Sequence, residues 1–176
     1  MSCDASITLF SEEVEQTHYI GECVGSVMRS GEIIALVGDL GAGKTQFVRG
    51  LAKGMGIRPE IVSSPTFVVM HEYERDDLAG LVLVHIDAYR LESAADLASI
   101  GWEDDGDEIR EDAVVAIEWA TLISQFLPQD MLSVRIQHNN PGRSITLTGQ
   151  HQLWNQRLNQ IASETATAGI AHENGI

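Results

Sequence analysis

The amino-acid sequence predicts a single α/β domain in which a mixed, mostly parallel sheet is flanked by helices. Three consecutive segments predict this fold class. Residues 32–37 are almost wholly apolar, as in a buried parallel strand. Residues 38–45 form a glycine-rich loop, and the apolar residues that follow recur at helical spacing until Gly56. A strand, a glycine-rich loop and a helix in this order are typical of phosphate-binding α/β proteins.

The loop satisfies the pattern G-x-x-x-x-G-K-[ST] in full. Its glycines let consecutive N–H groups point inward and form a nest for nucleotide phosphates. We expect Lys44 to reach the β- and γ-phosphates and the Thr45 hydroxyl to ligate Mg²⁺, at the positive end of the helix dipole. The alternative is a glycine-rich turn with a surface lysine, which the flanking strand and helix disfavour. The sequence therefore predicts a P-loop NTPase fold whose Walker A nucleotide-binding residues are Gly38, Asp39, Leu40, Gly41, Ala42, Gly43, Lys44 and Thr45.

Composition narrows the class of protein. The chain has 176 residues, enough for one domain with a proper core. Its 26 acidic residues outweigh 11 Lys and Arg, which gives a net charge of −15, and no basic run is present. Direct binding of nucleic acid by this chain alone is therefore disfavoured. Three features favour a cytoplasmic protein. The thiols Cys3 and Cys23 are isolated, no signal peptide is expected, and no apolar run is long enough to cross a membrane.

The first third of the chain starts loosely and then becomes regular. We expect a short edge strand at residues 7–10. Ser11 has the character of a helix N-cap, and its helix ends at Ser30 and Gly31. After the phosphate loop and its helix, residues 58–66 hold two prolines and are predicted to form an irregular loop.

The central third predicts a hairpin and a short helix. Residues 67–74 and 81–86 are β-rich runs that can pair as a hairpin. Residues 93–96 resemble an acidic capping box for a short helix that continues to Ile100. Residues 102–112 carry seven acids, and we expect an exposed connector there.

The last third predicts a buried strand at residues 113–117, a short helix near 121–126 and a hairpin of 131–137 with 143–148. A final helix follows, with Leu153, Trp154, Leu158 and Ile161 as its apolar face. We predict that the P-loop domain covers residues 1–162 and that the small and polar residues 163–176 form a disordered tail.

Magnesium-dependent phosphoryl chemistry needs a carboxylate and a group that places water. Asp87 ends an apolar strand and is the predicted Walker B acid, since strand ends converge on the nucleotide crevice. The alternative is an Asp that opens a turn. Glu118 ends another apolar strand, and a role with water or magnesium and a role as a rim carboxylate are equally supported by the residues alone. We expect Trp119 beside it to lie near the nucleotide.

Two further residues and one absent signature complete the site prediction. Thr66 lies in a loop of suitable length for a γ-phosphate sensor, although a lone loop threonine more often has no such role. His85 is interpreted as a core residue or as support for the site. The Asn-Lys-x-Asp guanine signature is absent, so a common GTPase is disfavoured.

The motifs, taken together in order, resemble the bacterial TsaE (YjeE) family. They are the phosphate loop, then Ser-Pro-Thr at 64–66, His-Ile-Asp-Ala-Tyr-Arg-Leu at 85–91 and Ile-Glu-Trp at 117–119. The resemblance implies a P-loop ATPase of tRNA threonylcarbamoyladenosine biosynthesis, which modifies position 37. It implies Mg²⁺ and ATP as ligands, the TsaB and TsaD proteins as partners, and contact with tRNA only through those partners.

The resemblance also implies roles for single residues. It makes Lys44 and Thr45 the phosphate and magnesium ligands, Asp87 the Walker B acid, Glu118 a magnesium-associated catalytic carboxylate and Thr66 the switch residue. It further implies that Thr17, four residues before Gly21, and Arg143 touch the nucleotide. Gln46 departs from the family, which often has Thr or Ser there.

Two alternatives remain open from the sequence. A small-molecule kinase would share this loop, with Arg49, Arg58 and Arg90 available for an anionic acceptor. A nucleotide-gated interaction module would use ATP to shift a switch loop, with turnover incidental.

Overall fold

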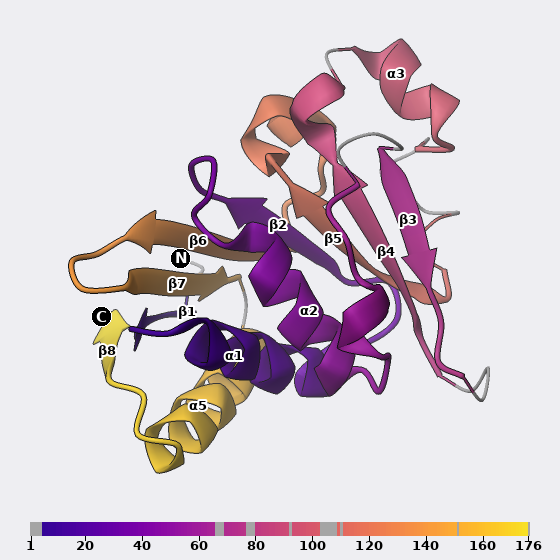
Figure 1. Ribbon diagram of the computed structural model, residues 1–176. Helices are drawn as coiled ribbons and strands as arrows, with labels where there is room; N and C mark the ends of the chain where they lie inside the picture. Colours follow the sequence, from indigo (N-terminus) through magenta and orange to yellow (C-terminus); the bar gives the residue numbers. More distant parts are fainter. Residues whose placement is uncertain are drawn as a thin grey trace.

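A single eight-stranded sheet forms the centre of the molecule (Figure 1). The computed structural model describes residues 5–65, 69–76, 80–91, 93–102, 109, 111–150 and 152–175. The strand order is β3-β4-β5-β2-β6-β7-β1-β8. The predicted α/β class, with a mixed sheet between helices, is confirmed.

The middle of the sheet is parallel. β2 (Ile33–Val37) lies between β5 (Ala113–Glu118) and β6 (Leu132–His138), and β4 (Val82–Asp87) pairs with the other side of β5. β5 is buried at all six positions, as expected of a strand covered on both faces. The carboxyl ends of these strands lie at one edge, where the phosphate loop follows β2.

Antiparallel strands complete both sides of the sheet. β3 (Met70–Tyr73) pairs with β4, and β7 (Arg143–Gly149) pairs with β6, so both predicted hairpins are confirmed. β1 (Ala5–Ser11) lies between β7 and β8 (His172–Gly175). The prediction of an edge strand at residues 7–10 is therefore wrong, because β8 covers the edge of β1.

Helices pack on both faces of the sheet. α1 (Val14–Val27), α2 (Lys44–Gly54) and α5 (Gln152–Thr167) share one hydrophobic core with one face of the sheet. The second core lies on the other face and includes Leu97 of α3 (Ala94–Ser99) and Ile123 of the 3₁₀ segment η4 (Ala120–Phe126). Two short 3₁₀ turns, η1 (Pro59–Ile61) and η2 (Ala88–Arg90), lie in the loops beside the site.

Glycines allow α1 and α2 to pack closely. A Cβ at Gly21 would lie 2.3 Å from the Phe47 carbonyl oxygen, and a Cβ at Gly50 would lie 2.0 Å from the carbonyl oxygen of His18. Gly25 and Gly54 are equally crowded by backbone of the opposite helix. These four glycines therefore let the backbones of α1 and α2 lie in direct contact.

Of the two predicted helix N-caps, one is confirmed and one is wrong. The capping box of α3 is confirmed, because Ser93 and Asp96 each accept a bond from the other's backbone N–H. Ser11 is not the cap of α1. It is the last residue of β1, and its hydroxyl donates to the Glu13 carbonyl while Glu13 itself occupies the N-cap position.

The predicted disordered tail is contradicted from residue 163 onward. α5 continues to Thr167, and β8 then pairs with β1. Thr165 and Ile170 are 0% and 3% exposed, since both pack into the protein. The composition of this segment resembles that of a disordered tail because only a few of its residues face the core.

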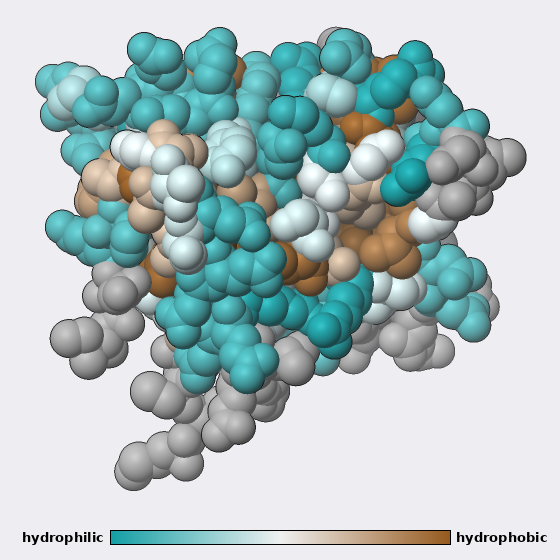
Figure 2. Space-filling view, turned by 90° about the horizontal axis from the view of Figure 1, so that it is seen from below, coloured by the Kyte–Doolittle hydropathy of each residue, from teal (hydrophilic) through white to brown (hydrophobic). Residues whose placement is uncertain are grey.

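The acidic stretch 102–112 is described only in part, and residues 103–108 and 110 lie outside the described residues. Trp102 is not exposed as predicted, because its ring is buried and its Nε1 donates to the Phe126 carbonyl at 3.2 Å. Figure 2 shows one face of the molecule, where hydrophilic side chains predominate and hydrophobic atoms are visible mainly in hollows between them. Among the described residues, no helix has the length and apolarity needed to cross a membrane.

Candidate nucleotide site

The loop between β2 and α2 has the backbone shape that its glycines predict. Gly41 and Gly43 have φ of +77° and +111°, a region that favours glycine. A Cβ at Gly38 would lie 2.4 Å from the Ile136 carbonyl oxygen. The tight turn and the start of α2 at Lys44 therefore place a helix amino terminus at the loop.

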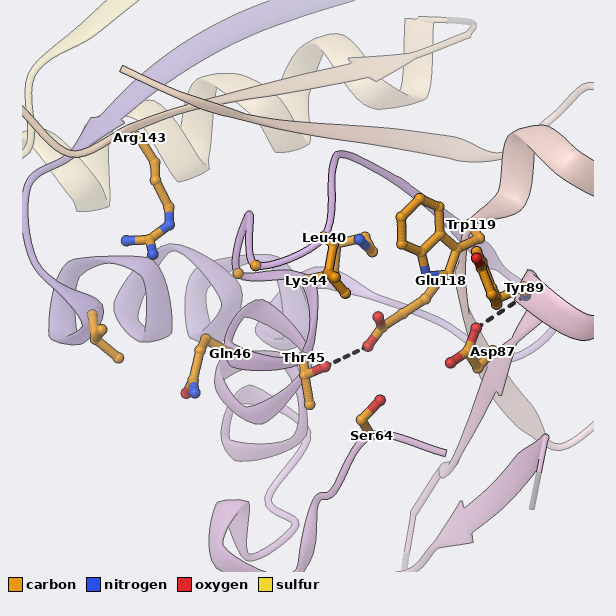
Figure 3. A pocket seen from close by; sticks show the side chains of 13 residues that line it. Leu40, Lys44, Thr45, Gln46, Ser64, Asp87, Tyr89, Glu118, Trp119 and Arg143 are labelled. Carbon is orange, nitrogen blue, oxygen red and sulfur yellow. Dashed lines mark hydrogen bonds between the residues drawn. The ribbon is translucent and has the colours of Figure 1, made fainter. Parts of the chain in front are cut away.

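A cavity of about 540 Å³ opens at this helix terminus (Figure 3). It is of the size that small-molecule ligands occupy. Loop, helix and strand-end residues all contribute to it. The lining residues are Val14, Leu40, Gly41, Gly43, Lys44, Thr45, Gln46, Ser64, Asp87, Tyr89, Glu118, Trp119 and Arg143.

Lys44 is 5% exposed and lies against the loop that precedes it. Its Nζ donates to the carbonyl oxygens of Gly38 at 2.8 Å and Asp39 at 3.0 Å. Burial lowers the pKa of Lys44 from its usual value, although nearby carboxylates, foremost Glu118, act in the opposite direction. The Lys44 ammonium group therefore loses hydration at the cavity wall. An anionic ligand in the cavity would offset that loss.

Glu118 connects the loop helix to the sheet. The Thr45 hydroxyl donates to Glu118 Oε1 at 2.7 Å, and His85 Nε2 lies 3.0 Å from the same oxygen. Burial alone would raise the pKa of Glu118. The bonds from His85 and Thr45 and the charge of Lys44 outweigh it, so the pKa is lowered and the carboxylate is ionised near neutral pH.

Asp87 lies beside Glu118 because the two residues pair in register at the ends of β4 and β5. Asp87 is 5% exposed, and its Oδ1 accepts a bond from the Tyr89 N–H at 3.0 Å. The hydroxyl of Thr45 and these two carboxylates line one cavity, as predicted. Three hard oxygen donors next to a phosphate loop are a suitable set for Mg²⁺, which keeps several waters and takes only a few protein ligands.

One aromatic ring covers the lysine, and a second ring packs against the first. Trp119 has a left-handed backbone with φ of 59°, which is unusual for a bulky residue. Its ring centroid lies 3.9 Å from Lys44 Nζ and 5.3 Å from the Tyr89 ring centroid. Trp119 thus lines the cavity at the end that also holds the carboxylates (Figure 3).

Three further residues were predicted to contact the nucleotide, and the structure places them differently. Arg143 lines the cavity, and its Nε donates to the Ala42 carbonyl at 2.6 Å. Thr17 is not at the cavity, since it is 1% exposed and its hydroxyl shares a 2.7 Å hydrogen bond with Ser11. Thr66 lies outside the described residues.

Within the loop, Leu40, Gly41 and Gly43 face the cavity, as do Lys44 and Thr45 of α2. The other three predicted residues contribute through backbone oxygens: Gly38 and Asp39 bind Lys44, and Ala42 binds Arg143.

Sequence reasoning missed four lining residues. Gln46, Ser64 and Tyr89 each lie within two residues of a predicted site residue, so their neighbours in sequence were the available signal. Val14 begins α1 three residues before Thr17, another predicted site residue, although Thr17 itself does not line the cavity.

The arginines considered for an anionic acceptor are placed elsewhere. Arg49 donates to the Val62 carbonyl at 3.0 Å, and Arg58 pairs with Asp76 at 3.1 Å. Neither they nor Arg90 are among the described residues that line the cavity.

Comparison with known proteins adds independent findings. Residues 11–145 match the family model described as "Threonylcarbamoyl adenosine biosynthesis protein TsaE". The relative from Bacillus subtilis is named as the tRNA threonylcarbamoyladenosine biosynthesis protein TsaE and is 37% identical, over 76% of this chain and 80% of its own. Relatives of the same name from Nostoc sp. and Streptomyces coelicolor are also 37% identical, covering 81% and 77% of this chain and 85% and 91% of theirs.

A solved structure has the same architecture. The crystal structure of YdiB from Bacillus subtilis matches with a TM-score of 0.70 and 27% identity. The match covers 93% of this chain and 97% of that one.

Proposed function

The chain belongs to the TsaE family of threonylcarbamoyladenosine biosynthesis proteins, and on that premise we propose that it is an Mg²⁺-dependent ATPase that acts through partner proteins. The observation that carries this proposal is the convergence of Lys44, Thr45, Asp87 and Glu118 on one cavity at the amino terminus of α2. A cation, a hydroxyl and two carboxylates in this arrangement suit a nucleoside triphosphate with its metal.

Each residue then has a chemical role. The backbone N–H groups of the loop and Lys44 bind the phosphates and offset the charge that develops on them. Thr45, Asp87 and Glu118 would supply the oxygen donors for the magnesium ion, and Glu118 would also orient the attacking water beside it. A magnesium ion held there would supply positive charge that neutralises part of the charge on the phosphates. Trp119 covers Lys44 and limits the access of bulk water to it.

The proposed partners are the TsaB and TsaD proteins, with tRNA contacted only through them. A net charge of −15 supports this division of labour, since the chain itself repels a phosphate backbone. TsaD would transfer the threonylcarbamoyl group to tRNA, and ATP hydrolysis by this chain would drive or reset the cycle in the cytoplasm.

Steady-state Mg-ATP turnover, measured first for the chain alone and then with TsaB and TsaD, tests this function. We expect slow turnover alone and clear stimulation by the pair, because partner contacts complete or order the site. Glu118→Ala should lose turnover in both conditions.

Two outcomes would redirect the assignment. If turnover rises on adding a small acceptor and not with the partners, the protein is a kinase. If Glu118→Ala loses hydrolysis but keeps partner-dependent tRNA modification, the protein is a nucleotide-gated module.

Tryptophan emission offers a direct report of occupancy. Trp119 lines the cavity, whereas Trp102 and Trp154 are buried elsewhere. We expect Mg-ATP to change the emission of the wild type, because a ligand would alter the surroundings of the Trp119 ring. Trp119→Phe should remove the change, and a change of equal size in that variant would refute the assignment.

A further inference from the structure

His85 lies on the same face of the sheet as the two carboxylates. Side chains alternate along a strand, so His85 and Asp87 of β4 share one face. The parallel register pairs His85 with Ala116 and Asp87 with Glu118, which makes His85 the diagonal neighbour of Glu118. This face packs against α2, the helix that begins with Lys44 and Thr45.

The imidazole makes one described hydrogen bond, and that bond goes to Glu118. His85 is fully buried, and its Nε2 lies 3.0 Å from Glu118 Oε1. A carboxylate oxygen only accepts, so both Nε2–H and the Thr45 hydroxyl donate to Oε1. Neither bond uses Oε2, which leaves that oxygen for a ligand in the cavity.

Packing alone does not explain a histidine at this position. Within the described part of the chain, His85 Nδ1 has no hydrogen-bond partner although it is buried. An unsatisfied buried nitrogen opposes folding, and an apolar side chain of similar size would avoid this cost. The hydrogen bond from His85 Nε2 to Glu118 explains why a histidine occupies this position.

We propose that His85 is a positioning residue for magnesium-nucleotide binding, because its Nε2–H fixes the Glu118 carboxylate next to Thr45. The proposal rests on the proposed function, since it assumes that a magnesium-nucleotide complex occupies the cavity. Removing the donor frees the carboxylate to rotate, and loss of such a partner typically costs 10–100-fold in metal affinity.

The test compares His85→Leu, His85→Asn and His85→Gln in the full chain. A glutamine amide nitrogen can reach the place of Nε2, whereas an asparagine amide is too short. A fluorescent ATP analogue is titrated first with EDTA and then with increasing Mg²⁺. His71→Leu serves as the control, because His71 pairs with His85 in register on β3 and contacts Tyr73 instead.

We expect all variants to bind the analogue in EDTA within about twofold of wild type. Half-maximal tightening by Mg²⁺ should need roughly 10–100-fold more magnesium in His85→Leu and His85→Asn. His85→Gln and His71→Leu should stay close to wild type. This pattern would establish the positioning role.

Other patterns overturn the proposal. Wild-type magnesium dependence in both His85→Leu and His85→Asn would show that Glu118 needs no such bond. Equal loss of affinity in EDTA and in Mg²⁺ for all three variants would show a purely structural role. A wild-type chain that binds no nucleotide would overturn the proposed function and this proposal together.

Discussion

Lys44→Ala is expected to lower Mg-ATP turnover roughly 10²–10³-fold, the typical effect of removing one group that stabilises developing charge in a transition state. Lys44 is the loop cation, and its Nζ is already held at the cavity by two loop carbonyls. In the proposed function, its loss would remove the ammonium charge that offsets the charge developing on the transferring phosphoryl group. Steady-state phosphate release and nucleotide affinity, both measured with Mg²⁺, check this result.

The same substitution should not cost stability through the charge itself. Burial lowers the pKa of Lys44, so the ammonium group is less favourable in the folded protein than in water. The Gly38 and Asp39 carbonyls lose their donor, so we expect a modest fall in the thermal unfolding midpoint that is too small to account for the loss of activity.

Lys53→Ala is the matched control. Lys53 is the only other lysine and lies on the same helix, but it is half-exposed and pairs with Glu22 at 2.7 Å. Exposed pairs contribute about 1 kcal/mol or less. Near-normal turnover in Lys44→Ala, or an equal loss in Lys53→Ala, would refute the site assignment.

Local patterns predicted the centre of the site well, for a physical reason. The phosphate loop is a contiguous motif, and its strand and helix are its immediate neighbours in the chain. Asp87 and Glu118 were found because the carboxyl ends of parallel strands meet at one edge, so two acids at strand ends meet there as well. The register then places them side by side.

Long-range packing was not predictable from such patterns. Thr17 is at the right spacing from Gly21, yet its hydroxyl bonds Ser11, because that face of α1 turns into the protein. Val14 reaches the cavity only because α1 packs on α2. The disordered tail was mispredicted for the same reason, since pairing of β8 with β1 involves residues more than 160 positions apart.

The sequence did carry one overlooked signal of this packing. Gly21 and Gly25 in α1, and Gly50 and Gly54 in α2, each form a G-x-x-x-G pattern. Small residues four apart share one helix face and let two backbones approach. The resemblance uses Gly21 only to mark the spacing of Thr17, whereas in the structure Gly21 contacts the backbone of α2.

Gly50→Ala is therefore expected to destabilise the protein by about 3 kcal/mol, at the upper end for overpacking. For a chain of this size, that corresponds to a fall of roughly 6–12 °C in the unfolding midpoint. The new Cβ would lie 2.0 Å from the His18 carbonyl oxygen, a backbone atom that moves only if α1 moves. Calorimetry or circular dichroism checks this value.

The sign of the Gly50→Ala effect is decisive, because the same change in an uncrowded helix stabilises by about 1 kcal/mol. Gly31→Ala is the control for a glycine substitution without a clash: φ is +82° and nothing lies within 4 Å of the new Cβ, so only backbone strain of about 1–2 kcal/mol applies. Stabilisation by Gly50→Ala, or a loss smaller than that of Gly31→Ala, would contradict the close helix contact. A confirmed loss would support a dependence of the position of Lys44 and Thr45 on α1, because these glycines bring the backbones of α1 and α2 into contact. In that case Mg-ATP affinity should fall in Gly50→Ala even below its unfolding temperature, whereas Gly31→Ala should bind as tightly as the wild type.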